Sequence, residues 1–160
     1  MGTRGFYGFR YKGRYILFYN HWDSYCGRLG QQIRDELANF TEADYKTLVG
    51  LLKQHLLNKT LKEGDHWGDH WDEGERDYES LMKVAQNPKK YVLSHVSREC
   101  PGIDLYIEYT YIVDLDKKFL RVITGNDKFK FPLHELPPRM DVYDEECEDE
   151  VDTDLSEDEE

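Results

Sequence analysis

The stretch from Asn20 to Gly30 places nearly every kind of functional side chain within a few residues. A histidine, a tryptophan, an aspartate, a serine, a tyrosine and a cysteine follow one another at positions 21–26. Loops at the ends of strands often carry the residues that bind or react. One interpretation therefore predicts a pocket with walls made by Asn20, His21, Asp23 and Tyr25. In it, the binding residues would be His21, Trp22, Asp23 and Tyr25.

The same stretch also has a purely structural interpretation. Asp23 or Ser24 would form a turn, because its short side chain can hydrogen-bond neighbouring backbone N–H groups. Trp22 and Tyr25 would then cover the core, and two glycines would lead into a helix. The sequence leaves both interpretations open.

A β-hairpin precedes this motif and brings it close to the first residues. Residues 4–11 and 14–20 are rich in aromatic and branched side chains, and Lys12-Gly13 between them is suited to a tight turn. The hairpin starts almost at Thr3, so Thr3 and the motif are expected to share one end of the sheet.

A short duplication suggests a weak metal site. Residues 64–67 and 68–71 both read Gly-Asp-His-Trp. On a helix His66 and His70 would share a face at the spacing of metal-binding histidines. Glycines in this region oppose a stable helix, so we expect a loop, no metal ion and no cofactor.

The remaining patterns predict an α+β fold. Apolar spacing indicates helices at 31–40, 42–58 and 77–86, the second opening with a Thr41–Asp44 capping box. Further strands are predicted at 91–96, 103–115, 119–124 and 128–131. We therefore expect a mostly antiparallel sheet of about six strands with two to three helices packed on it, in a single domain spanning residues 1–140.

The net charge of −12 comes from the C-terminal residues. Residues 141–160 contain six Asp and seven Glu and no Lys or Arg. Like charges at this density repel one another, so a disordered acidic tail is predicted. Such a tail suits a basic protein partner and makes direct nucleic-acid binding unlikely, while an exposed aromatic patch would permit a homo-oligomer.

Cysteine usage and hydropathy indicate the compartment. Cys26, Cys100 and Cys147 form no Cys-x-x-Cys pair, which fits free thiols in a reducing environment. No apolar run is long enough for a signal peptide or a membrane span. An intracellular, cytoplasmic protein without membrane association is expected, or a virion-associated one if the chain is viral.

Three motifs together resemble a family of small proteins from microbes, fungi and large DNA viruses. They are Met1-Gly2-Thr3-Arg4, the stretch from Tyr19 to Tyr25, and the segment from Tyr109 to Asp116. This resemblance covers most of residues 1–124. It implies kinship but no particular reaction.

The strand at the N-terminus and the acid-bearing motif after the second strand are similar to N-terminal-nucleophile (Ntn) hydrolases. That resemblance implies an Ntn-like sandwich fold. After removal of Met1 and Gly2, it makes Thr3 a candidate nucleophile, with Asn20, Asp23 and Arg4 as orienting and charge-stabilising groups. The first helix offers no lysine to stand near the amine, which departs from the proteasome-like members.

These observations favour a non-catalytic binding or interaction protein that engages protein partners. The alternative is an N-terminal-nucleophile amidohydrolase with Thr3 as its nucleophile.

Overall fold

A single six-stranded sheet forms the body of the protein. The computed structural model describes residues 3–66, 77–100, 107–125 and 127–144. Within them β1 and β4 are parallel and every other neighbouring pair is antiparallel, which confirms the expected α+β class. The strands lie in the order β3 (Leu93–Ser97), β2 (Arg14–Asn20), β1 (Gly5–Tyr11), β4 (Tyr109–Asp114), β5 (Phe119–Ile123) and β6 (Lys128–Pro132).

The predicted N-terminal hairpin is present. Lys12 and Gly13 both have positive φ, 54° and 76°, as a two-residue type I′ turn requires. The carboxylate of Asp116 accepts hydrogen bonds from the backbone N–H groups of Lys12 (2.7 Å) and Gly13 (2.9 Å). The hairpin tip is therefore tied to the turn between β4 and β5.

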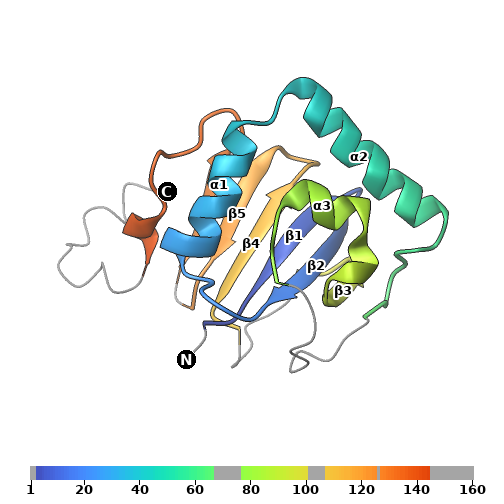
Figure 1. Cartoon of the computed structure of the whole chain (residues 1–160), viewed down its shortest axis with the longest axis horizontal. Coiled ribbons are helices and arrows are strands. Elements are labelled where there is room, and N and C mark those ends of the chain that lie inside the picture. Colours follow the sequence, from blue (N-terminus) through green and yellow to red (C-terminus); the bar gives the residue numbers. More distant parts are fainter. Residues whose placement is uncertain (1–2, 67–76, 101–106, 126, 145–160) are drawn as a thin grey trace.

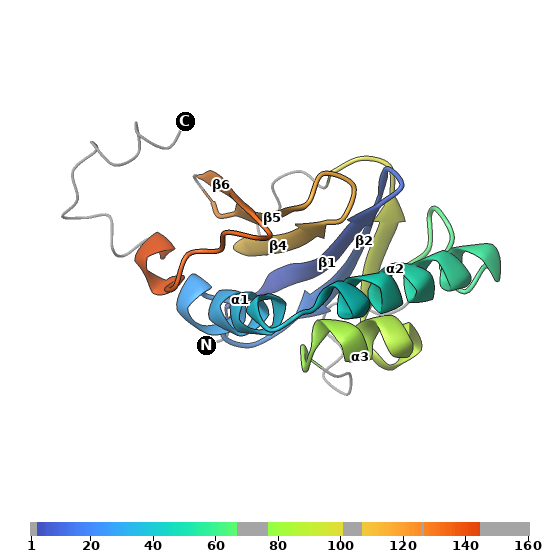
Figure 2. The same ribbon diagram turned by 90° about the horizontal axis from the view of Figure 1, so that it is seen from above.

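Three helices cover one face of the sheet, as Figures 1 and 2 show. They are α1 (Gln31–Ala38), α2 (Glu42–Leu57) and α3 (Leu81–Gln86). The expected capping box is formed, because Thr41 Oγ1 accepts from Asp44 N and Asp44 Oδ2 accepts from Thr41 N. The core between helices and sheet contains Tyr7, Phe9, Phe18, Ile33, Leu37, Leu48 and Leu52, all nearly fully buried.

Glu36 on α1 holds the start of α3. Its carboxylate accepts hydrogen bonds from Leu81 N (2.7 Å), Met82 N (3.2 Å) and the hydroxyl of Tyr78. Together with Ser80, whose hydroxyl accepts from Lys83 N, it satisfies the free N–H groups of this short helix. The third helix therefore starts at Leu81, later than the predicted residue 77.

The opposite face of the sheet carries a second, smaller cluster. Strand alternation directs Phe6, Tyr15, Leu17, Tyr19 and Ile112 away from the helices, and all five are buried. A sandwich needs two stacked sheets, whereas the described residues form one. The expected Ntn-like sandwich is therefore not found in this part of the chain.

The C-terminal part of the domain runs back along α1 (Figure 1). Arg34 Nε donates to Pro137 O, Gln31 Oε1 accepts from Met140 N, and a 3₁₀ turn, η3, spans Asp141–Tyr143. The sequence predicts residues 141–144 as part of the acidic tail, whereas in the structure they belong to the fold. The rest of that segment, 145–160, lies outside the described residues. No helix in the described ranges combines the length and apolarity that crossing a bilayer would need.

Candidate functional site

Asn20 organises the corner that follows β2. Its amide Nδ2 donates to Trp22 O (2.8 Å) and to Ser24 Oγ (2.9 Å), while Oδ1 accepts from Tyr78 N (3.1 Å). The side chain is buried, so each of these bonds replaces one that water would otherwise make. The amide is fully engaged in holding the backbone, and Asn20 therefore has a structural role.

Ser24 packs tightly against Gly5 in β1. Its backbone N–H donates to Thr3 O (3.1 Å), and its carbonyl accepts from the Tyr111 hydroxyl (2.6 Å). A Cβ on Gly5 would lie 2.8 Å from the Ser24 side chain, so only glycine fits there. The serine joins the N-terminal strand, the corner and β4 in one buried contact.

The turn after this corner is π-helical and is closed by an acid from the far end of the chain. η1 (Cys26–Gly30) begins where Tyr25 O accepts from Arg28 N and Gly30 N. Asp144 Oδ1 accepts from Cys26 N (2.6 Å) and Oδ2 from Gly27 N (3.1 Å). The carboxylate thus satisfies two N–H groups at a helix start, where negative charge is favoured.

The predicted binding residues differ in their surroundings. Asp23 points to solvent and pairs with exposed Arg28 at 3.3 Å, and its positive φ of 55° shows that it forms the turn. Trp22 is 55% exposed and stacks edge-on with His21, while Tyr25 packs on Tyr109. The turn-forming interpretation of Asp23 is thus the one that its geometry favours.

His21 is anchored by its backbone and its ring together. Its N–H donates to Asp77 Oδ1 (2.9 Å), and its Nδ1 lies 2.8 Å from the hydroxyl of Tyr19. Burial raises the pKa of Tyr19, while the nearby Arg4 guanidinium lowers it. The Arg4 guanidinium therefore lies beside the Tyr19 hydroxyl.

Thr3 meets the motif through its backbone, since its carbonyl is the acceptor for Ser24 N. Thr3 is buried, with 5% of its surface exposed, and its predicted partners Asn20 and Asp23 are occupied as described above. The structure therefore brings Thr3, Asn20 and Ser24 together as a packed joint. Of the weak metal candidates, His66 is exposed and His70 lies outside the described residues.

A groove at the opposite end of the helical layer was missed by sequence reasoning. It has a volume of about 1070 Å³ and lies between α1, the first half of α2, the β4–β5 turn and residues 133–136. We call it the α1–α2 groove. Its apolar floor is made by buried or half-buried side chains: Leu37, Phe40, Tyr45, Val49, Leu115, Leu133 and Leu136.

The rim of the groove is predominantly basic. Exposed Lys46, Lys53 and Lys118 surround it, joined by Arg34 and His134, against two acids, Glu42 and Glu135. Arg34 is already bonded to Pro137 O and Asp35, so the lysines are the cations free to meet a ligand. Among the residues described, no salt bridge engages these three lysines.

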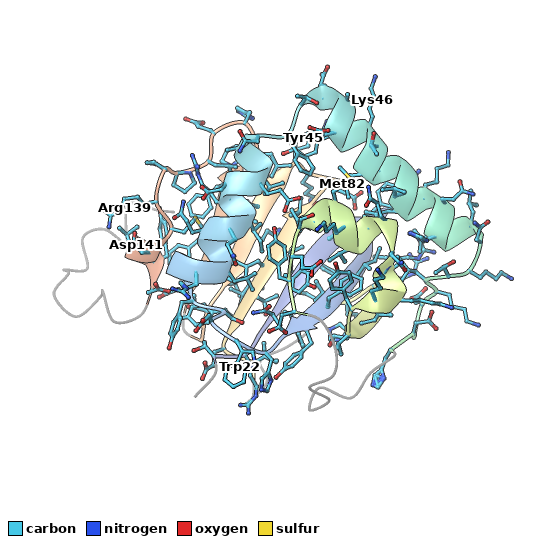
Figure 3. The ribbon with its side chains drawn as sticks, in the orientation of Figure 1. Trp22, Tyr45, Lys46, Met82, Arg139 and Asp141 are labelled. Carbon is cyan, nitrogen blue, oxygen red and sulfur yellow. The ribbon has the colours of Figure 1, made fainter. Side chains whose placement is uncertain are left out.

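Tyr45 places a polar atom among the apolar groups of the floor. Its ring packs edge-on against Phe40 at 5.0 Å, and its hydroxyl is buried without a hydrogen-bond partner in the described structure. Burial raises the pKa of Tyr45 above 10.0, which keeps the group a neutral donor. In Figure 3 Tyr45 lies between α1 and α2, Lys46 projects outward, and Trp22 is at the other end of the molecule.

The groove offers an apolar surface and cationic groups. Those are features for holding a ligand that has both apolar and anionic parts. The described residues contain no cluster of three metal-binding side chains. Comparisons with known proteins found no matching family model, and neither the curated proteins nor the solved structures gave a significant match.

Proposed function

We propose that this protein is a non-catalytic interaction protein that binds an acidic, amphipathic peptide segment of a partner protein in the α1–α2 groove. The observation that carries the proposal is the combination of an apolar floor with a lysine rim. Aliphatic side chains of the segment would cover the floor, and its carboxylates would meet the lysines.

The charge of the groove decides which kind of partner fits. The acidic sequence beyond residue 140 by itself suggested a basic partner, but the groove exposes Lys46, Lys53 and Lys118. A basic segment would be repelled there, whereas an acidic one gains about 0.2–1 kcal/mol for each exposed ion pair. Apolar anchors in the floor supply the larger share of the affinity.

The corner at residues 20–30 serves a different purpose in this proposal. The Asn20 amide and the Ser24 carbonyl make internal hydrogen bonds, and Asp144 binds the start of η1. The corner therefore acts as the joint that holds β1, β4 and α1 in place. The alternative amidohydrolase requires a free α-amine at Thr3, and no geometry at Asn20 or Asp23 favours it. Intact mass tests it directly, because that enzyme must begin at Thr3.

Binding of a synthetic peptide tests the proposed function. A fluorescein-labelled peptide with leucines spaced four apart among aspartates is titrated with the full chain, and anisotropy is read at 0.1 M NaCl. A second peptide carries lysine in place of each aspartate. We expect the acidic peptide to bind and the basic peptide not to bind.

Charge reversal then locates the site. Lys46→Glu with Lys53→Glu is expected to weaken binding of the acidic peptide by about tenfold or more, because two attractive contacts become repulsive. Lys90→Glu, an exposed reversal outside the groove, is the matched control and should leave affinity unchanged. Both reversals are made in a chain that also carries Val151→Ser and Leu155→Ser, so that the chain's own acidic segment does not compete with the peptide. Equal affinity in the groove variant and in the control would refute the proposal.

A further inference from the structure

The acidic residues that follow Asp144 have the chemistry of a ligand for the groove. Residues 145–160 contain eleven Asp and Glu and no Lys or Arg. Two aliphatic side chains, Val151 and Leu155, stand four positions apart among these acids. The aliphatic side chains suit the apolar floor of the groove, and the acidic side chains suit its lysine rim.

The point at which this segment leaves the fold sets how far it can reach. Asp144 is fixed to Cys26 N and Gly27 N at the start of η1, while Leu37 at the end of α1 lines the groove. From residue 26 to residue 38 the helical rise covers roughly 18 Å. The six residues 145–150 span at most about 20 Å when extended. Val151 can therefore arrive at the near end of the groove.

Charge and tethering both favour this occupant. The lysine rim meets a segment of strongly opposite charge, and a short connection within one chain gives an effective concentration in the millimolar range. A weak contact is thereby enough to fill the groove in the same molecule. The two acids of the rim, Glu42 and Glu135, lie at exposed positions and oppose this attraction only in part.

We propose that residues 145–160 bind back into the α1–α2 groove of their own chain, with Val151 and Leu155 on the apolar floor and the neighbouring carboxylates at Lys46, Lys53 and Lys118. The inference rests on the proposed function and adds its regulation: the segment competes with the partner peptide. Binding then requires a partner that displaces it, or a condition such as high salt that weakens the tether's charge contacts.

A spin label reports on this contact without any ligand. Cys147 is labelled with a nitroxide in a Cys100→Ser variant, in which Cys26 remains protected by burial. We expect the amide NMR signals of Lys46, Val49 and Lys118 to lose at least half their intensity. The signals should recover in Lys46→Glu with Lys53→Glu, and at 0.5 M NaCl. Full intensity in the native groove, or a loss that grows with protein concentration and so comes from a second copy, would overturn the proposal.

Peptide affinity separates failure of this inference from failure of the proposed function. Val151→Ser with Leu155→Ser, made in the full chain, should bind the acidic peptide about tenfold more tightly if the segment fills the groove nine-tenths of the time. Equal affinity in the variant and the native chain overturns the self-binding while the proposed function stands. Absence of binding in both chains counts against the proposed function, and the spin-label result then decides the self-binding alone.

Discussion

Replacement of Asp144 by alanine tests whether residues 141–144 hold the corner together. The Asp144 carboxylate accepts two backbone hydrogen bonds, 2.6 Å from Cys26 N and 3.1 Å from Gly27 N. Cys26 is fully buried and Asp144 is 9% exposed, so water does not readily replace the lost acceptor. The variant leaves two N–H groups at the start of η1 without their charged partner.

The expected loss follows from these contacts. A hydrogen bond to a charged group contributes about 1.5–3 kcal/mol, and the longer bond to half-buried Gly27 N belongs at the low end. The two together give about 3–4.5 kcal/mol. For a domain of this size that corresponds to a fall of roughly 6–15 °C in the unfolding midpoint. A stability of about 5–15 kcal/mol in total means that the variant still folds.

Urea unfolding followed by tryptophan fluorescence and thermal unfolding followed by circular dichroism measure the loss. Asp141→Ala is the control, because its exposed carboxylate pairs with exposed Arg139 at the surface. Surface ion pairs contribute little, so its loss should leave the midpoint nearly unchanged. An Asp144→Ala midpoint within error of the native one would refute the assignment of this carboxylate as a cap.

Two truncations extend the same test. Removal of residues 145–160 takes away no described contact. If the segment fills the groove nine-tenths of the time, its removal should lower the free energy of unfolding by about 1.4 kcal/mol. Removal of residues 141–160 also takes away Asp144 and the ring of Tyr143, which packs on Phe129 (4.8 Å) and Phe131 (5.2 Å). Each aromatic pair adds about 0.5–1.5 kcal/mol beyond its buried area. The chain without residues 141–160 should therefore have a lower free energy of unfolding than the chain without residues 145–160. The difference should be at least as large as the loss caused by Asp144→Ala.

Three further changes probe the core and the corner. Tyr7→Phe removes a buried hydroxyl without a partner and should raise the free energy of unfolding by about 1 kcal/mol, measured by urea titration. Burial raises the pKa of Tyr7 well above 10.0, so only the unfolded chain loses this proton just above pH 10. The free energy of unfolding of the native chain should therefore fall as the pH rises above 10. In Tyr7→Phe this fall should be less steep, by up to about 1.4 kcal/mol per pH unit. An equal slope in the two chains would count against a buried Tyr7. Asn20→Asp should cost about 2–4 kcal/mol because an oxygen then faces Ser24 Oγ and a backbone carbonyl, and an unchanged midpoint would contradict the structural role. Gly8→Ala should cost about 3 kcal/mol or more, since its Cβ would lie 2.0 Å from Ile16 O, and normal yield and stability would show that this contact is wrong.

Local elements were predictable because each is coded by neighbouring residues. The Lys12-Gly13 turn, the alternation of the first hairpin and the Thr41–Asp44 capping box all act within a few positions, and each is found in the structure. Element ends were less certain: α1 ends at Ala38, short of the predicted residue 40, because nothing in the local pattern specifies the last turn.

The chemistry of the corner could not be read from the motif alone. Asn20 and Asp23 are equally compatible with a catalytic site and with a turn as long as their partners are unknown. The partners come from distant segments: Tyr78 and Tyr111 for the Asn20–Ser24 joint, and Asp144 for η1. These contacts engage the Asn20 amide, the Ser24 carbonyl and the Cys26 N–H in internal hydrogen bonds.

The sequence by itself determined the α+β class, the helices, the hairpins and the acidic character of residues 141–160, since these follow from local periodicity, turn chemistry and charge. Only the tertiary structure decided that residues 141–144 complete the corner and that Lys46, Lys53 and Lys118 ring an apolar groove. The physical reason is that a groove and a buried carboxylate arise where segments far apart in sequence meet. The local sequence around each segment does not specify these long-range contacts.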